Sequence, residues 1–190
     1  MNDCLHPLIQ QRRSERIIDP GKTVEPEKIM LLLEAARWAP SCGNRQSWRF
    51  VISRGRLLDE LKNHLSRGNN WGRNAPLIIT IASKADLGCQ IEERDYYTLD
   101  LGLAMENMLL QGVHLGLIMH PIAGFDEAGV KTLLGIPGEY RIHALLIVGY
   151  PGSFSDVDKR TLDKEAMPRE RKSIETFVFW EQWNDVNNHE

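Results

Sequence analysis

The amino-acid sequence predicts an α+β fold, and three observations indicate it. Three runs enriched in branched and aromatic residues are typical of strands, at residues 48–53, 76–83 and 142–151. Helical patterns precede the first run and separate the others, and one of these patterns is long. The order of elements lacks the regular strand–helix alternation of a dinucleotide-binding sheet, and no GxGxxG motif is present.

Two helices are expected before the first strand. Apolar residues at Leu5, Leu8 and Ile9 predict a short one that ends near residues 10–16. The second is predicted over residues 25–38, because its apolar residues recur at the i, i+3, i+4, i+7 spacing of one helix face. They are Ile29, Leu32, Leu33 and Ala36. Pro26 suits the first turn of this helix, and Pro40 stops it.

The central part of the chain alternates between strand and helix patterns. Residues 57–65 form the next predicted helix, with leucines on one face. Residues 76–83 are almost continuously apolar and β-branched, which predicts a buried strand. A long helix is predicted from about Asp95 to Ile118. Its glycines indicate close packing against a neighbour, either inside the domain or across a subunit interface.

The last third of the chain has a short helix pattern, a strand pattern and a polar tail. Residues 126–137 predict an amphipathic helix that ends in a glycine and a proline. Residues 142–151 predict a buried strand. Residues 152–173 are polar and interrupted by proline and glycine, and no element is predicted there. An aromatic-rich end follows, with Phe177, Phe179, Trp180 and Trp183.

Composition excludes several classes of protein. A chain of 190 residues with ordinary globular composition is expected to form one domain. The net charge of −3 gives no overall attraction to nucleic acid or to anionic membranes. No apolar run approaches the roughly 18 residues of a membrane span, and the N-terminal residues carry no signal-peptide pattern. We therefore expect a soluble cytoplasmic protein that binds neither nucleic acid nor membrane.

The cysteines and histidines carry no recognisable metal or disulfide pattern. Cys4, Cys42 and Cys89 are odd in number, widely spaced and without a CxxC pair. This arrangement is typical of a reducing compartment and argues against a disulfide framework or a zinc site. Cys42 has the alternative role of a reactive thiol, although no histidine lies near it in sequence. His114 and His120 have no acidic partner nearby and are interpreted as core or helix-end residues rather than metal ligands.

Four polar segments are candidates for ligand binding. Residues 12–16, RRSER, combine three guanidinium groups with a hydroxyl, which suits phosphate but also a solvated helix end. Residues 39–50, APSCGNRQSWRF, form either a ligand-facing turn or a simple helix-to-strand connection. Residues 120–125, HPIAGF, and the basic residues 168–172, PRERK, admit the same two interpretations.

Taken in order, the four segments resemble the nitroreductase family of FMN-dependent oxidoreductases. The family pattern has Arg-Arg-Ser-x-Arg at a helix end, and here Arg12 to Arg16 match it. Its Ala-Pro-Ser-x-x-Asn-x-Gln-Pro-Trp turn is matched from Ala39 to Trp48. Its Pro-Ile-x-Gly-Phe loop is matched from Pro121 to Phe125, and a basic pair is matched by Arg169 and Arg171. The resemblance spans about residues 8–175, nearly the whole chain.

The resemblance implies a nitroreductase-like fold and an obligate homodimer. The fold has a central, mostly antiparallel sheet flanked by helices, and a C-terminal arm exchanged between subunits. Residues 1–172 would form the FMN-binding domain, and residues 173–190 an extension that packs on the partner subunit. Two FMN sites would lie at the subunit interface.

The resemblance also implies roles for individual residues. Arg12 and Ser14 would hold the FMN phosphate and ribityl chain, with Arg13 beside that chain and Arg169 and Arg171 over the phosphate. Arg16 would point at the pyrimidine edge of the flavin, where a cation stabilises the reduced form. The remaining positions fall into two groups. The other subunit would contribute Pro40, Ser41, Cys42, Asn44 and Gln46. The isoalloxazine ring would be lined by Pro121, Ile122, Ala123 and Gly124, with a backbone amide near N5, and its edge contacted by Asn69 or Asn70.

The activity implied is electron transfer from NAD(P)H, through bound FMN, to nitroaromatic, quinone or similar electron-poor acceptors. The order would be ping-pong, and no catalytic side chain or metal is required, because the flavin performs the chemistry. One alternative keeps the fold but uses the flavin for reductive dehalogenation or flavin breakdown. A second alternative, of another class, is a non-catalytic module whose basic clusters bind nucleic acid.

This sequence departs from the family pattern at four places. Ser47 stands where proline is usual, which we expect to loosen the turn slightly. Cys42 replaces a frequent serine and makes the turn oxidisable. Ala123 stands where some members carry an acidic residue, so a nicotinamide or substrate contact there is not carried over. The segment between Ser83 and Tyr96 is short, which predicts a reduced active-site lid.

Overall fold

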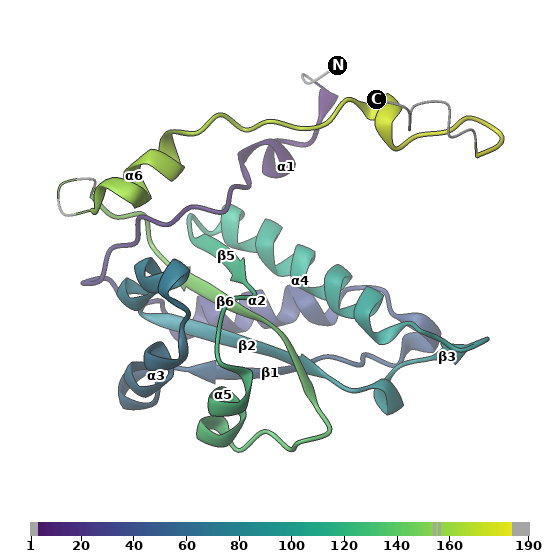
Figure 1. The fold of residues 1–190 in the computed structure, drawn as a ribbon, viewed down its shortest axis with the longest axis horizontal. Helices are drawn as coiled ribbons and strands as arrows, with labels where there is room; N and C mark the ends of the chain where they lie inside the picture. The colour runs from purple at the N-terminus through teal and green to yellow at the C-terminus, as the bar shows by residue number, and fades with distance from the viewer. Residues whose placement is uncertain (1–3, 154, 156, 184–190) are drawn as a thin grey trace.

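The fold is built on one four-stranded sheet. The structure is a computed structural model that describes residues 4–153, 155 and 157–183 (Figure 1). The strands are β1 (Arg49–Ser53), β2 (Leu77–Ser83), β5 (Ile118–Ile122) and β6 (Arg141–Gly149). Their order across the sheet is β1-β2-β6-β5, and every neighbouring pair is antiparallel. The predicted α+β class with an antiparallel sheet is confirmed.

Helices cover both faces of the sheet, so its strands are apolar on both sides. On one face, α2 (Pro26–Arg37) packs on α4 (Tyr97–His114), and their apolar side chains join Ile79 and Leu146 of the sheet. On the other face lie α3 (Gly55–Leu61) and α5 (Glu127–Leu134), whose core includes Ile78 and Ile147. Successive strand residues thus enter opposite cores, as the pleat requires.

The remaining elements are short. They are α1 (Pro7–Gln11), η2 (Cys42–Asn44), η3 (Lys62–His64), η4 (Arg67–Asn74), η5 (Ala85–Leu87), β3 (Gln90–Ile91), β4 (Arg94–Asp95), α6 (Lys159–Ala166) and η7 (Ile174–Thr176). β3 and β4 form a separate two-stranded hairpin just before α4.

The predicted helix over 95–118 is wrong at its C-terminal end. α4 ends at His114, and Gly116 takes a left-handed conformation with φ of 71°. There the chain turns, so that residues 118–122 become β5 at the edge of the sheet beside β6. A Cβ on Gly112 would collide with the side chain of Met119, so this glycine serves close packing inside the domain.

The polar segment 152–173 contains a helix, α6, that the sequence did not predict. Thr161 is its only buried residue, so α6 carries no apolar stripe for a pattern search to find. Beyond α6 the chain runs past α1, far from it in sequence (Figure 1), and the guanidinium of Arg169 donates to the backbone oxygen of Gln10. In the described part of the chain, no helix is long and apolar enough to cross a membrane.

Candidate functional site

Two basic segments from opposite ends of the chain meet in one pocket. The pocket has a volume of about 410 Å³ and lies between residues 12–16 and residues 164–171. It brings together six of the residues predicted to hold a cofactor: Arg12, Arg13, Ser14, Arg16, Arg169 and Arg171. We call this the basic pocket. Its other lining residues are Lys164, Glu165, Met167, Pro168 and Glu170.

The positive charges of the basic pocket crowd one another. The pKa of Arg169 is lowered from its usual value, first by burial and then by the charges of Arg171, Arg12 and Arg13. Arginine nevertheless stays protonated, because a guanidinium group keeps its proton in proteins. Guanidinium groups held together with few carboxylates are best relieved by an anion that accepts several hydrogen bonds. The donor set therefore fits a phosphate group.

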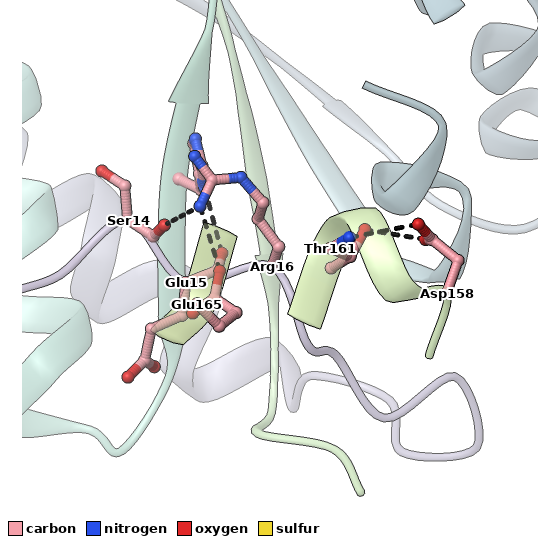
Figure 2. Close-up of polar contacts among 7 residues, drawn as sticks. Ser14, Glu15, Arg16, Asp158, Thr161 and Glu165 are labelled. Carbon is pink, nitrogen blue, oxygen red and sulfur yellow. Dashed lines mark hydrogen bonds and ion pairs between the residues drawn. The ribbon is translucent and has the colours of Figure 1, made fainter. Parts of the chain in front are cut away.

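Arg16 lies at the inner side of the basic pocket with its charge already paired. Figure 2 shows its guanidinium pointing toward Glu165, to which it donates across 3.0 Å, and toward the backbone oxygen of Ser14 at 3.4 Å. Glu165 comes from α6, whose first turn is fixed by Asp158. That carboxylate accepts from the amide of Thr161 at 3.1 Å and from its hydroxyl at 2.8 Å. Asp158 thus caps α6 and helps to place Glu165.

His120 on β5 anchors the segment that carries Arg16. Its Nδ1 donates to the backbone oxygen of Glu15 at 3.0 Å, since a carbonyl can only accept. Its ring lies 4.5 Å from that of Trp71, and only 8% of the residue is exposed. Burial lowers the pKa of His120 to about 4. The neutral ring is therefore a structural support, as its interpretation as a core residue predicted.

The predicted flavin-lining residues occupy the end of β5 and the bend after it. Pro121 and Ile122 belong to the strand, and the Ile122 side chain is buried in the core, so it has only backbone to offer a ligand. The bend is fixed by Asn69, whose amide donates to the backbone oxygen of Gly124 at 2.9 Å. A Cβ on Gly124 would lie 2.5 Å from the Ser66 hydroxyl and 2.7 Å from that amide nitrogen, so a larger residue would displace both side chains. Ala123 is exposed and lines a different pocket, with Arg141 and His143.

The turn after α2 is rigidly built. Gly43, Asn44 and Gln46 all have positive φ, at 56°, 54° and 49°. The amide of Gln46 donates to the hydroxyl of Ser41 at 3.0 Å, which holds this unusual backbone in place. Within one chain, Pro40, Ser41, Cys42, Asn44 and Gln46 do not line the basic pocket.

A buried carboxylate fixes the turn to α4. Asp100 is 1% exposed and accepts from the amide of Cys42 at 2.9 Å and from the hydroxyl of Ser47 at 3.1 Å. The backbone oxygen of Ser47 in turn accepts from the hydroxyl of Ser83 at 2.7 Å. The expectation that Ser47 loosens the turn is therefore wrong, because its hydroxyl donates a hydrogen bond to Asp100 that proline could not form. Trp48 follows and is buried in the core.

The cysteine prediction also needs correction, because Cys42 and Cys89 are joined by a disulfide. They are 47 positions apart in sequence, but their Cα atoms lie 5.8 Å apart. The bond links the turn to the start of the β3–β4 hairpin. Sequence spacing did not reveal this pair, since only the fold brings η2 beside the segment before α4. Cys4 is a free, exposed cysteine.

Several residues at the site were not predicted from the sequence. Glu165 and Lys164 sit in a helix without an apolar stripe, and Asp100 lies inside an apolar helix pattern. A buried carboxylate in such a helix does have one signature, namely a charged residue on the predicted inward face.

A smaller pocket of about 190 Å³ adjoins the site and shares Lys164, with Arg67 and Arg160 on its walls. Within residues 4–153, 155 and 157–183, no group of three or more possible ligands is placed to hold a metal ion.

Comparison of the sequence with known proteins gives consistent matches. Residues 9–70 and 63–150 match the model of the nitroreductase family. A protein of Archaeoglobus fulgidus named "Putative NADH dehydrogenase/NAD(P)H nitroreductase" is 32% identical over 164 residues, covering 82% of this chain and 90% of that protein. Protein DrgA of Synechocystis sp. is 30% identical over 171 residues, covering 74% of this chain and 81% of that protein.

Solved structures share the fold. One described as "the oxidoreductase containing FMN" has a TM-score of 0.85 at 24% identity, covering 95% of this chain and 93% of that one. A nitroreductase family protein from Clostridium difficile 630 has a TM-score of 0.76 at 22% identity, covering 93% and 97%.

Proposed function

This chain belongs to the nitroreductase family and is an oxidoreductase, and we propose that it passes electrons from NAD(P)H through bound FMN to nitroaromatic, quinone or similar electron-poor acceptors. When bound, FMN would supply the hydride and electron transfer, in a ping-pong order in which the oxidised nucleotide, NAD(P)+, leaves before the acceptor binds. The protein then has three tasks, which are to hold the cofactor, to orient it and to tune its electronics.

The observation that carries this proposal is the meeting of residues 12–16 with residues 164–171 in the basic pocket. Arg12 and Ser14 would bind the phosphate and ribityl end of FMN, with Arg13 beside them and Arg169 and Arg171 over the phosphate. Burial and then the charges of Arg171, Arg12 and Arg13 lower the pKa of Arg169, and this grouping of cations supports an anion as the natural occupant.

Orientation of the ring would fall to the end of β5 and to Arg16. Pro121, Ile122, Ala123 and Gly124 would line it, with a backbone amide near N5. The hydrogen bond from Asn69 to the Gly124 oxygen supports this arrangement, because it fixes the bend in one conformation. Arg16 would face the pyrimidine edge, where its charge stabilises the electron-rich reduced ring.

We also propose that the active unit is a homodimer with FMN at the interface. The turn residues Pro40, Ser41, Cys42, Asn44 and Gln46 would serve the partner's FMN, which agrees with their absence from the basic pocket of their own chain. Residues 1–172 would form the FMN domain and residues 173–190 an arm on the partner. Exposed apolar side chains support such contacts: Leu5, Ile9, Leu99, Leu103, Ile174, Phe177, Trp180 and Trp183.

The cytoplasm is the proposed compartment. In that compartment the Cys42–Cys89 disulfide would be a reversible one, since cytosolic disulfides are usually transient.

Ala123 is the observation that favours a second candidate chemistry. It is exposed and brings no acidic side chain to the flavin-lining bend, so an acceptor contact seen in other members has no counterpart. Reductive dehalogenation or flavin breakdown on the same fold is that candidate.

The first experiment is a visible spectrum of the purified protein before and after addition of FMN. Flavin absorbance that stays with the protein through gel filtration supports the proposal, and a preparation that never retains FMN contradicts it. NAD(P)H oxidation with nitrofurazone or menadione then tests the reaction. Bound FMN without turnover of either acceptor would favour the second candidate chemistry.

A further inference from the structure

We propose that Cys42 and Cys89 form a thiol–disulfide exchange site that controls the attachment of the β3–β4 hairpin to the turn after α2. The site takes small thiols as reductants and small disulfides as oxidants. Its consequence for FMN rests on the proposed function, while the exchange and the release of the hairpin do not.

The position of the two cysteines supports reversible exchange. Both residues are partly exposed rather than buried in the core, which favours attack by a small thiol. Their Cα separation of 5.8 Å is within the range that a disulfide spans without backbone movement. Cys42 begins η2, and Cys89 immediately precedes β3. The bond therefore connects a turn to a hairpin rather than two elements of the core.

The turn does not depend on the disulfide for its shape. The amide of Cys42 and the hydroxyl of Ser47 are both held by the buried Asp100. The Ser41 hydroxyl holds the amide of Gln46. With these ties intact, reduction leaves the turn in place and leaves the core next to it unchanged.

The hairpin is held much less firmly. β3 and β4 contain two residues each, and residues 90–95 are all exposed. Besides its own strand pairing, the hairpin has side-chain bonds within itself, from Gln90 to Asp95 at 3.3 Å and from Arg94 to Glu92 at 2.8 Å, and both are exposed to water. Its base is closed by the amide of Tyr96, which donates to the backbone oxygen of Cys89 at 3.0 Å. One side-chain tie to the turn remains, from Arg45 to the backbone oxygen of Gly88 at 3.2 Å. Isolated two-stranded hairpins are marginally stable in water, so loss of the disulfide should let this one open.

The exchange balances without any further reactant. A thiolate attacks one sulfur of the Cys42–Cys89 bond, forming a mixed disulfide and releasing the other cysteine as a thiolate that takes up a proton. A second thiol then resolves the mixed disulfide. In total, two small thiols are oxidised to one disulfide, and the protein gains two thiol groups.

A link to FMN follows because the turn carries Ser41 and Asn44, which are proposed to face the partner's cofactor. When the hairpin opens, the turn loses its contacts with the segment around Cys89, namely the disulfide and the bond from Arg45 to the Gly88 oxygen. We expect the oxidised protein to bind FMN several-fold more tightly than the reduced protein. By thermodynamic reciprocity, FMN must then stabilise the disulfide against reduction by the same factor.

The first test counts thiols and follows proteolysis of the full-length protein. The oxidised form should expose one alkylatable thiol, Cys4, and treatment with dithiothreitol should add Cys42 and Cys89. Trypsin cleavage after Arg94, the exposed first residue of β4, should accelerate several-fold on reduction. Cys4→Ser is the matched control and should keep both responses. Three reactive thiols before reduction, or equal cleavage of the two forms, would overturn the proposal.

The second test compares FMN dissociation constants by flavin-fluorescence titration. Wild type should bind several-fold more weakly after reduction, whereas Cys89→Ser, which alters no proposed cofactor contact, should bind like the reduced protein with or without dithiothreitol. Equal affinity of the two wild-type forms would remove the link to the cofactor. If no form binds FMN, the proposed function fails, and the cleavage rate at Arg94 still decides whether the hairpin is under thiol control.

Discussion

The guanidinium of Arg16 and the carboxylate of Glu165 meet across 3.0 Å although 149 positions separate them in the sequence. Their side chains are 24% and 12% exposed, so water screens the pair less than an ordinary surface ion pair. The contact ties α6 to the segment that leads into the core. It also places a negative charge beside the cation proposed to face the flavin.

Replacing Glu165 should change the electronic environment of the cofactor. In Glu165→Gln the Arg16 charge is no longer compensated, and a cation near the pyrimidine edge favours the electron-rich reduced flavin. The midpoint potential of bound FMN should therefore rise, as measured by dye-coupled reductive titration. Glu170→Gln removes a carboxylate elsewhere in the basic pocket and is the matched control. Equal shifts in the two variants would show that only net charge matters.

Arg12→Ala should weaken FMN binding without unfolding the protein. Arg12 is partly exposed in the basic pocket, and a hydrogen bond to a charged partner contributes roughly 1.5–3 kcal/mol, which is about a 10- to 150-fold change in affinity. Flavin-fluorescence titration measures it. Arg67→Ala, in the adjoining smaller pocket, should bind FMN nearly as wild type does. Unchanged affinity in Arg12→Ala would remove this residue from the site.

Asp100→Ala should destabilise the fold and loosen the turn together. It removes the acceptor for the Cys42 amide and the Ser47 hydroxyl in a buried position. Leaving buried donors unpaired should cost at least roughly 2 kcal/mol in the free energy of unfolding by urea. Asp163→Ala, on the exposed side of α6, should have little effect. Equal stability of these two variants would contradict the role given to Asp100.

His120 should make the fold less stable in mild acid. Its folded pKa of about 4 lies below the usual 6.5, so the unfolded chain binds the proton more readily between these values. Stability should rise with pH from about 4 to about 6.5 and then level off, with a contribution of roughly 3 kcal/mol.

Urea unfolding across this pH range measures the His120 effect. His120→Phe keeps an aromatic ring against Trp71 but cannot titrate, so its stability should depend less on pH in that window. A wild-type slope in His120→Phe would assign the acid sensitivity to other groups.

The aromatic end of the chain should be needed for dimerisation. Phe177, Trp180 and Trp183 are 61%, 85% and 76% exposed and lie within seven positions of one another, as expected of an apolar contact surface for another protein chain. Light scattering should give twice the chain mass of 21.7 kDa for the full protein. Removal of residues 173–190 should shift the population toward monomer at low concentration and weaken FMN binding. A full-length monomer would contradict both the exchanged arm and the shared site.

Local patterns were sufficient for most elements of the fold. The apolar spacing over 25–38 predicted α2, and the β-branched run at 76–83 predicted β2 almost residue for residue. β5 was missed, because residues 118–122 continue the apolar character of α4 and only the left-handed Gly116 separates the two. α6 was missed because it buries only Thr161.

The sequence by itself determined the residue types at the candidate site and the order of the four motifs, since these depend on short stretches of chain. Tertiary structure alone decided which distant residues meet. It pairs Glu165 with Arg16, brings Asp100 within hydrogen-bonding distance of the Cys42 amide and joins Cys89 to Cys42. Such contacts depend on how the sheet, α4 and α6 pack together, and no periodicity within a short segment encodes a meeting between residues 47 to 149 positions apart.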